Sequence, residues 1–326
     1  MELFRNFKIF TVALLSMGGI IHPAIAAADK KYVAVTQIVS HPALDAVRSG
    51  IKEKLVAYAA KNKIDLIWIF ENAQGNIAVA AQIANKFAGS EPDVIVAIST
   101  PSAQTAISAT RDTGIPVVFA AVTDPEAAQL VTNLEKPGGR VTGTYDFPPI
   151  GKQLDLMKSI LPEAKTVGIL YSPGEVNSVR QLELFKKEAE ARGLKVIEGA
   201  ATKSTEVLPA TQKLLHKVDV IYVPADNTIM STLAGVTSLA MQEGKAVIVP
   251  DPEGIKSGGL ATVGYSHFEE GEICGEIIIR ILKGEDPGLI PVQLPNEEKM
   301  FINIEVARKL NLKIPKAVLD EAFVWR

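Results

Sequence analysis

Short apolar runs rich in β-branched residues alternate along the chain with amphipathic segments of helical length. This alternation predicts parallel β-sheets whose strands are connected by crossover helices. In the first half of the chain, strands are expected at residues 32–39, 64–70, 94–98 and 117–121. Helices are expected in the intervals between these strands.

The pattern begins again after a stretch that contains proline and glycine, residues 142–151. Strands are expected there at 166–171, 195–198, 220–223 and 246–249, with helices at 178–192 and 228–243. The polar sequences that follow the strands also repeat, because Asp226 follows Ser99, and Asp251 follows Asp124, by 127 positions each. This repeat predicts an α/β protein of two similar, doubly wound parallel-sheet lobes.

The chain is expected to pass between the two lobes three times, at residues 142–151, 264–268 and 294–301. The N-terminal lobe would then comprise residues 29–145 plus 265–294. The C-terminal lobe would comprise residues 146–264 plus 295–326. Three connections of this kind form a hinge on which two lobes can close.

Residues 1–28 have the features of a secretory signal peptide. Arg5 and Lys8 form a short basic region, residues 9–21 are almost uninterruptedly apolar, and Ala24 and Ala26 are small residues at the positions that a signal peptidase reads. The apolar run is shorter than the roughly 20 residues that a membrane-spanning helix needs. We therefore expect cleavage and export to the periplasm.

Composition and charge limit the classes of protein to which the chain can belong. A chain with 47% hydrophobic and 22% charged residues has enough apolar area for large cores. The formal charge of −3 provides no basic surface for nucleic acid or an anionic membrane. Cys274 is the single cysteine, so the cores must hold the fold without an internal disulfide. We expect a monomer.

Neither a catalytic nor a metal-binding motif is evident in the sequence. The three histidines after the signal region, His41, His216 and His267, have no partners at metal-ligand spacing. A nucleophile elbow and a phosphate-binding loop are also missing from the sequence. These observations predict a binding protein that is not an enzyme and needs no cofactor or metal.

Ligands of open parallel sheets bind beyond the carboxyl ends of the strands, so polar residues directly after the predicted strands are the candidate contacts. Several of them are equally suited to capping a helix, and Ser40 is one such candidate cap. For a ligand side chain, Tyr145, Phe147 and Tyr265 at the crossings are candidate walls, although most aromatic residues simply pack in a core. The candidate ligand contacts are Ser40, His41, Gln74, Ser99, Thr100, Ser102, Thr123, Tyr145, Asn177, Asp226, Asn227 and Asp251.

The charges expected in the two halves are complementary. Hydroxyls and free N–H groups at the helix start that contains Ser99, Thr100 and Ser102 favour a carboxylate. In the matched loop, Asp226 would hold an ammonium group, and Asp251 would join it. One lobe binding a carboxylate and the other an amine is the arrangement expected for a zwitterionic amino acid.

Five motifs identify a family. They are Ser40-His41-Pro42-Ala43-Leu44-Asp45, Asn72-Ala73-Gln74-Gly75, Val122-Thr123-Asp124-Pro125, Leu134-Glu135-Lys136-Pro137-Gly138-Gly139 and Tyr222-Val223-Pro224-Ala225-Asp226-Asn227-Thr228. With them, essentially the whole chain after the signal region resembles the ABC-transporter substrate-binding proteins of the tryptophan and tyrosine uptake type. The resemblance implies a type I periplasmic-binding-protein fold, closure around one aromatic or hydrophobic amino acid, and delivery to an ABC permease and ATPase in the inner membrane.

Two other functions on the same fold stay open at this point. One is a sugar or nucleoside receptor, and the other is a binding protein that serves a sensor. Sugar sites usually stack the sugar ring on paired aromatic side chains. Trp68 lies in an apolar predicted strand and Trp325 lies at the extreme C-terminus, so neither is well placed for stacking.

Overall fold

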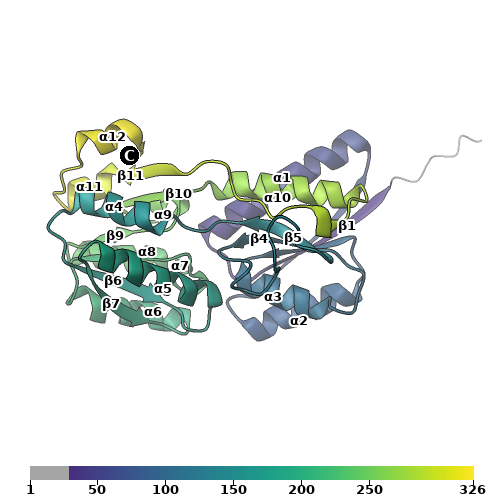
Figure 1. Cartoon of the computed structure of the whole chain (residues 1–326), viewed down its shortest axis with the longest axis horizontal. Coiled ribbons are helices and arrows are strands. Elements are labelled where there is room, and N and C mark those ends of the chain that lie inside the picture. Colours follow the sequence, from purple (N-terminus) through teal and green to yellow (C-terminus); the bar gives the residue numbers. More distant parts are fainter. Residues whose placement is uncertain (1–28) are drawn as a thin grey trace, which may run out of the picture.

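The structure, a computed structural model, describes residues 29–326; the predicted signal peptide, residues 1–28, lies outside the described residues. The described chain forms two α/β lobes that lie side by side along the long axis of the molecule (Figure 1). Each lobe has its own β-sheet with helices packed on both faces. The predicted two-lobed α/β fold is confirmed.

The N-terminal lobe is built on a five-stranded parallel sheet in the order β2-β1-β3-β4-β5. Strands β3 and β4 are buried along their whole length, as expected of central strands covered by helices on both faces. The strands are β1 (Lys30–Gln37), β2 (Asp65–Asn72), β3 (Val94–Ile98), β4 (Val117–Val122) and β5 (Val141–Tyr145). The helices are α1 (Pro42–Asn62), α2 (Ile77–Gly89), α3 (Thr100–Ala109) and, from much later in the chain, α10 (His267–Leu282).

The C-terminal lobe is built on a seven-stranded sheet in the order β12-β11-β10-β9-β8-β6-β7. Its strands are β6 (Thr166–Tyr171), β7 (Lys195–Ala200), β8 (Val220–Tyr222), β9 (Ala246–Ile248), β10 (Ala261–Gly264), β11 (Lys299–Asn303) and β12 (Phe323–Trp325). Its helices are α4 (Ile150–Ile160), α5 (Val176–Ala191), α6 (Ser204–Leu215), α7 (Asn227–Met230), α8 (Leu233–Gln242), α9 (Pro252–Lys256), α11 (Ile304–Lys309) and α12 (Lys316–Glu321). A short 3-10 helix, η1 (Pro287–Leu289), follows α10.

Both sheets contain the same core strand order, because β7-β6-β8-β9-β10 corresponds strand for strand to β2-β1-β3-β4-β5. Ser99 therefore follows β3, and Asp226 follows β8, which is the equivalent strand of the other lobe. Likewise, Asp124 and Asp251 follow the equivalent strands β4 and β9. The sequence repeat thus reflects a structural repeat, with matched loops at the carboxyl ends of the two sheets.

The observed elements differ from the predicted ones in two respects. Four strands, β5, β10, β11 and β12, were not expected, and β11 is antiparallel to β10. The reason is topological, because β10 leads out to the hinge and β11 returns from it beside β10. The single helix expected at 228–243 is divided into α7 and α8. Between them, the hydroxyls of Ser231 and Thr232 donate to backbone carbonyls of α7, which competes with helix continuation.

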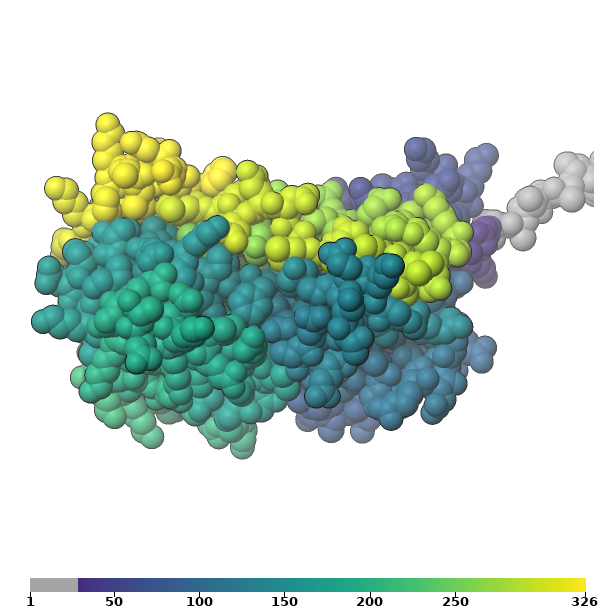
Figure 2. Space-filling view, in the orientation of Figure 1, coloured from purple at the N-terminus to yellow at the C-terminus, as the bar shows by residue number. Residues whose placement is uncertain are grey.

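The first and third crossings run beside each other. Thr144 forms a parallel bridge with Gln293, and the backbone N–H of Tyr145 donates to the Gln293 carbonyl at 3.0 Å. The third crossing continues along the edge of the molecule into the C-terminal lobe (Figure 2). At the second crossing, the Tyr265 hydroxyl donates to Glu298 of the third at 3.0 Å. The hinge is therefore one connected bundle of segments.

Two glycines allow α1 and α10 to cross with their backbones almost in contact. A Cβ atom at Gly50 would lie 2.3 Å from the Phe268 carbonyl oxygen, and one at Gly271 would lie 2.2 Å from the Val47 carbonyl oxygen. No side chain fits at either position without moving a helix.

Among the helices of residues 29–326, none combines the length and the apolar character that crossing a membrane requires.

Candidate functional site

The carboxyl ends of the two sheets face each other, and two cavities that share Asn227 lie between them. The outer compartment, about 430 Å³, has mainly apolar walls from the N-terminal lobe, with Gln74 and Asn76 as polar exceptions, and mainly polar walls from the C-terminal lobe. Its apolar lining residues include Ile38, Val39, Ile77 and Pro101, and its polar ones include Glu175, Asn227 and Thr228. The inner compartment lies beside the hinge and has about 20 Å³, room for about one water molecule. Its polar lining residues include His41, Thr123, Asp146, Asn177, Asn227 and Asp251.

The outer compartment lies where the doubly wound topology places ligands. In each sheet the strand order reverses between the first and third strands of the lobe, which makes the loops after those strands the switch point. Val39 and Pro101 come from the switch point of one lobe, and Ser172 and Asn227 from that of the other. The two switch points therefore face each other across one cavity.

The start of α3 carries three buried hydroxyls with no hydrogen-bond partner, those of Ser99, Thr100 and Ser102. Ser99 occupies the N-cap position but its side chain makes no capping bond, so capping does not explain these residues. A buried hydroxyl without a partner costs about 1–3 kcal/mol. Pro101 lines the outer compartment, so this helix start borders the cleft. Its unsatisfied donors and helix dipole suit an anionic ligand group.

His41, rather than Ser40, is the N-cap residue of α1. The Ser40 hydroxyl instead donates to the Asp45 carboxylate at 2.7 Å, so its expected capping role is wrong. Burial, with the nearby charge of His267, lowers the pKa of His41 to about 4. The imidazole is therefore neutral near pH 7, and its buried Nδ1 has no partner. A neutral imidazole in the inner compartment can donate or accept a hydrogen bond.

Asp226 does not fit the ammonium-binding role that the sequence suggested. It is fully buried and caps α7 through a bond from the Ile229 N–H at 2.9 Å to Oδ1. Its Oδ2 accepts from the Ser172 N–H at 2.6 Å and from the Ser178 hydroxyl at 2.5 Å. Both oxygens are thus occupied inside the C-terminal lobe. Burial, and then the charge of Glu175, raise the pKa of Asp226 well above its usual value.

Asp251, rather than Asp226, lies where a carboxylate can contact a ligand ammonium group in the cleft. It lines the inner compartment, and its Oδ1 caps α9 by accepting from the Gly254 N–H at 2.7 Å. Burial raises its pKa to about 7, although the nearby charge of His267 opposes the shift. A cationic ligand group would supply a further counter-charge.

Four further predicted contacts lie around the compartments. Thr123 and Asn177 line the inner one, and the Asn177 Oδ1 is buried without a partner. Asn227 lines both, and its side-chain N–H donates to Glu175 at 2.6 Å. Gln74 lines the outer compartment from a left-handed backbone conformation with φ of 53°.

The proposed aromatic walls are not where the sequence placed them. Tyr145 packs against the core of the N-terminal lobe, and neither it nor Phe147 lines the two compartments. Tyr265 lines a separate small cavity of about 10 Å³ on the hinge side, with Pro148 and Pro149. The apolar surface in the outer compartment is aliphatic instead.

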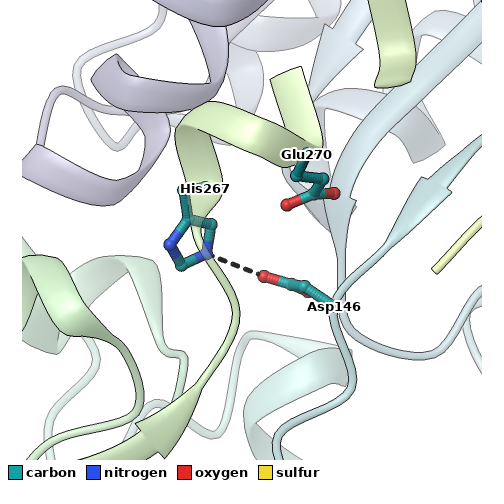
Figure 3. A group of neighbouring side chains, drawn as sticks. All are labelled: Asp146, His267 and Glu270. Carbon is teal, nitrogen blue, oxygen red and sulfur yellow. Dashed lines mark hydrogen bonds and ion pairs between the residues drawn. The ribbon is translucent and has the colours of Figure 1, made fainter. Parts of the chain in front are cut away.

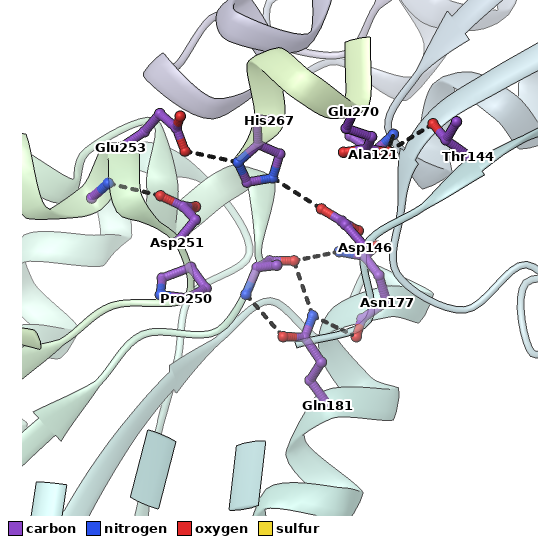
Figure 4. A network of polar contacts seen from close by, with 12 residues as sticks. Ala121, Thr144, Asp146, Asn177, Gln181, Pro250, Asp251, Glu253, His267 and Glu270 are labelled. Atoms are coloured by element: carbon purple, nitrogen blue, oxygen red, sulfur yellow. Dashed lines mark hydrogen bonds and ion pairs between the residues drawn. The ribbon is translucent and has the colours of Figure 1, made fainter. Parts of the chain in front are cut away.

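A buried cluster of titratable residues at the hinge was not predicted from the sequence (Figures 3 and 4). The His267 Nε2 lies 3.0 Å from Asp146 Oδ2, and its Nδ1 lies 2.8 Å from Glu253 Oε2. These carboxylates raise the pKa of His267 well above its usual value, against the opposing effect of burial. Glu270, on the same helix turn, has its pKa raised to about 7 by burial and by the charge of Asp146.

One signal for this cluster is visible in the sequence. His267 and Glu270 are three positions apart beside one predicted crossing, and Asp146 lies in another. Residues at such spacing share one face of a helix, and the crossings meet at the hinge.

Ion pairs also connect the two lobes directly. Arg180 of α5 lies 3.2 Å from Asp124, which follows β4 in the other lobe. Glu253 of α9 contacts His267 at the start of α10. Both contacts require the lobes to be close together, so they stabilise a closed arrangement.

Comparisons with known proteins agree with this architecture. A family model described as ABC transporter substrate binding protein matches residues 32–325. The tyrosine-binding protein of Clostridioides difficile (strain R20291) is 39% identical over 285 residues, 87% of this chain and 82% of the relative. A Streptococcus pneumoniae structure described as an ABC domain in complex with L-Trp is 37% identical, with a TM-score of 0.86, over 91% of this chain and 99% of the other.

A third relative gives information on the lobe arrangement. The ligand-free, open structure of a Clostridium difficile substrate binding protein is 38% identical over 91% of this chain and 99% of the other, but its TM-score is 0.67. At nearly equal sequence identity, the described structure thus superposes better on the L-Trp complex than on the open protein. This difference agrees with the closed arrangement indicated by the ion pairs between the lobes.

Proposed function

Because the chain belongs to the ABC transporter substrate-binding protein family, we propose that it binds an aromatic L-amino acid between its lobes and delivers it to an ABC permease and ATPase. The observation that carries this proposal is a pair of features on opposite sides of the cleft. On one side Pro101 borders the outer compartment, and the buried hydroxyls of Ser99, Thr100 and Ser102 beside it have no partner. On the other side the buried carboxylate of Asp251 lines the inner compartment. The relatives that bind tyrosine or L-Trp support the choice of ligand class.

The backbone groups of the amino acid are assigned to the part of the cleft between the start of α3, which borders the outer compartment, and Asp251, which lines the inner one. The ligand carboxylate accepts hydrogen bonds from the start of α3, where hydroxyls and the helix dipole favour an anion. The ligand ammonium contacts Asp251, which replaces Asp226 in the scheme suggested by the sequence. A charge-assisted hydrogen bond to a buried carboxylate is about twice as strong as a neutral one, so it fixes the orientation of the ligand.

The ligand side chain is assigned to the outer compartment. Its volume of about 430 Å³ lies in the usual range for small-molecule sites, roughly 300–1,000 Å³. Ile38, Val39 and Ile77 provide apolar surface there. Burying an aromatic side chain against such surface contributes roughly 25 cal/mol for each Å² removed from water.

Entry of a ligand requires the lobes to separate. The inner compartment, with about 20 Å³, holds about one water molecule, which is too little for an amino-acid head group. Opening at the hinge would make Asp251 and the start of α3 accessible, and the lobes would then close around the ligand with the inner compartment widened by the head group. The ligand shifts the population toward the closed state by its additional contacts there.

The ligand class can be tested by thermal unfolding of the chain without residues 1–28. L-tryptophan, L-tyrosine and L-phenylalanine should each stabilise the protein; at 100 times its Kd a ligand contributes about 2.7 kcal/mol. For a protein of this size that corresponds to a rise in Tm of roughly 5–10 °C. D-amino acids serve as matched controls. Stabilisation by sugars or nucleosides alone would contradict the proposal and favour the alternative receptors.

The ion pair between Arg180 and Asp124 should favour closure and hence ligand affinity. Replacing Arg180 with alanine should weaken amino-acid binding by about three- to five-fold. The effect is small because Arg180 is 40% exposed, and exposed ion pairs contribute up to about 1 kcal/mol. Titration calorimetry measures the affinity, and small-angle scattering measures the opening of the ligand-free protein.

The control for this experiment is Glu183→Gln. Glu183 lies 3.6 Å from Arg180 on the same helix, so its loss leaves the contact between the lobes intact. Unchanged affinity in Arg180→Ala, or an equal loss in Glu183→Gln, would argue against a role for this pair in closure.

Location and partners follow from the same proposal. The signal-peptide pattern of residues 1–28 and the family both support export to the periplasm. There the closed, ligand-loaded protein would present both lobes to the permease. The ATPase acts on the permease from the other side of the membrane and need not contact this chain.

A further inference from the structure

We propose that the hinge holds one divalent transition-metal cation between Asp146, His267 and Glu270, on the hinge side of the inner compartment. One ligand atom from each of the three residues lies within 4.8 Å of the others. His267 and Glu270 lie on the first turn of α10, and Asp146 lies in the first crossing opposite them (Figure 3). The site therefore joins two segments that are separated by more than one hundred residues in sequence.

Two carboxylate oxygens in this cluster are free to bind a cation. Glu270 is fully buried; its Oε1 accepts from the Ala121 N–H at 2.9 Å and from the Thr144 hydroxyl at 2.8 Å, while its Oε2 has no partner. Asp146 is 9% exposed, and its Oδ1 is also without a partner. Buried carboxylate oxygens are otherwise paired, because an unpaired one is costly.

The imidazole of His267 is oriented as metal-binding histidines are. Its Nδ1 lies 2.8 Å from Glu253 Oε2, so the Nδ1–H donates to that carboxylate and Nε2 faces Asp146 (Figure 4). A metal-ligating histidine nearly always donates its other ring N–H to such an acceptor. The hydrogen bonds from the Ala121 N–H and the Thr144 hydroxyl to Glu270 Oε1 likewise fix the orientation of that carboxylate. On metal binding, Nε2 would release its proton to solvent and exchange its contact with Asp146 for the cation.

The charge of the hinge cluster also calls for a cation. Asp146, Asp251, Glu253 and Glu270 surround one imidazole, and within residues 29–326 none of the four carboxylates forms an ion pair with lysine or arginine. The ammonium group of a bound amino acid reaches the inner compartment, which Asp146 and Asp251 line. Glu270 is not among the residues that line it. The proposed ligand therefore does not reach Glu270, which shares the one imidazole of His267 with the other carboxylates.

The ligand set determines the kind of metal. One imidazole nitrogen with two carboxylate oxygens suits Zn²⁺ and Mn²⁺, with Zn²⁺ bound more tightly. Ca²⁺ and Mg²⁺ prefer sites made of oxygen atoms alone and should bind weakly here. A metal at this place would connect the first crossing to α10 and so stiffen the hinge.

The test uses the chain without residues 1–28 and without a histidine tag, after dialysis against a chelator. Titration calorimetry with Zn²⁺, and elemental analysis after gel filtration, should show about one bound Zn²⁺ per chain. Glu270→Gln and His267→Gln should each weaken Zn²⁺ binding at least ten-fold. Mg²⁺ and Ca²⁺ serve as comparison ions.

The matched control is His216→Gln. His216 is an exposed histidine 4.0 Å from Glu243, so it is the place where weak adventitious Zn²⁺ binding is expected. Loss of the tight binding in His216→Gln but not in Glu270→Gln would overturn the proposal. The absence of stoichiometric Zn²⁺ binding by the unmodified chain would also overturn the proposal.

Folding and amino-acid binding are measured on the same variants. Glu270→Gln keeps the acceptor for Ala121 and Thr144, so urea unfolding and circular dichroism should show a folded protein. Binding of L-tryptophan to Glu270→Gln reports on the cleft separately. Failure of the metal proposal would therefore leave the proposed transport function standing, and failure of amino-acid binding would leave the metal result interpretable.

Discussion

Replacing Asp251 with asparagine should weaken the binding of L-tryptophan or L-tyrosine by about 100-fold. Removing one partner of a buried, hydrogen-bonded charge pair costs about 2–5 kcal/mol, and each 1.4 kcal/mol is a factor of ten in affinity. The fold should survive, since asparagine caps a helix as well as aspartate does and can still accept from the Gly254 N–H. Calorimetry with both amino acids measures the effect.

The control variant for this experiment is Asp286→Asn. Asp286 also caps a helical turn that begins with proline, and its Oδ1 accepts from the Gly288 N–H at 2.9 Å, but it does not line either compartment. A second control is a ligand without the ammonium group, such as 3-indolepropionate, for which Asp251→Asn should cost nothing. If Asp251→Asn bound L-tryptophan with an affinity within three-fold of that of the unmodified protein, Asp251 would not be the residue that holds the ammonium.

Replacing Gly50 with alanine should destabilise the N-terminal lobe by about 3 kcal/mol, the upper end of the usual cost of overpacking. The new Cβ would lie 2.3 Å from the Phe268 carbonyl oxygen, and a backbone atom cannot rotate away as a side chain can. Helix α10 would have to move, and His267 and Glu270 would move with it. Urea unfolding followed by near-ultraviolet circular dichroism measures the change.

Gly89→Ala is the matched control for this change. Gly89 is the last residue of α2, and a Cβ there meets nothing within 4 Å. Since alanine favours a helix more than glycine does, by up to about 1 kcal/mol, this variant should be as stable as the unmodified protein or slightly more stable. If Gly50→Ala unfolded at the same urea concentration as Gly89→Ala, the close crossing of α1 and α10 would have to be more adaptable than the structure indicates.

The fold was largely predictable because the core strands have strong local signals. Val94–Ile98 and Val117–Val122 are continuous apolar runs that only a buried strand explains at such a length. Strand β12 had no such signal, since Phe323, Val324 and Trp325 are all exposed. Strand β11 depends on its partner β10 rather than on its own sequence.

The candidate site was predictable by position but not by role. Loops after the strands line the two compartments, because topology fixes where they lie, and which of their residues contact a ligand stays a prediction. Asp226 and Asp251 are both helix caps after equivalent strands, and the sequence cannot distinguish them. The difference arises from Ser172 and Ser178, which occupy the Asp226 carboxylate from another element of the C-terminal lobe.

The hinge cluster could not be assembled from the sequence for a related reason. Asp146 and His267 are 121 positions apart, and Glu270 becomes significant only because Ala121 and Thr144 hold one of its oxygens. Such contacts depend on the first and second crossings meeting in space beside the end of β4. Local sequence patterns describe each crossing segment but not where the segments contact one another.

The late position of α10 in the chain has a consequence for how the protein matures. Cys274, Ile277 and Ile278 of α10 complete the apolar core that β1, β3, β4 and α1 begin. A growing polypeptide that ends before residue 267 therefore leaves the facing side of α1 uncovered, and the first lobe cannot acquire its native packing during most of synthesis. The order of translation thus delays folding of the lobe that is made first, which keeps most of the nascent chain in a loosely structured form until both halves are nearly complete.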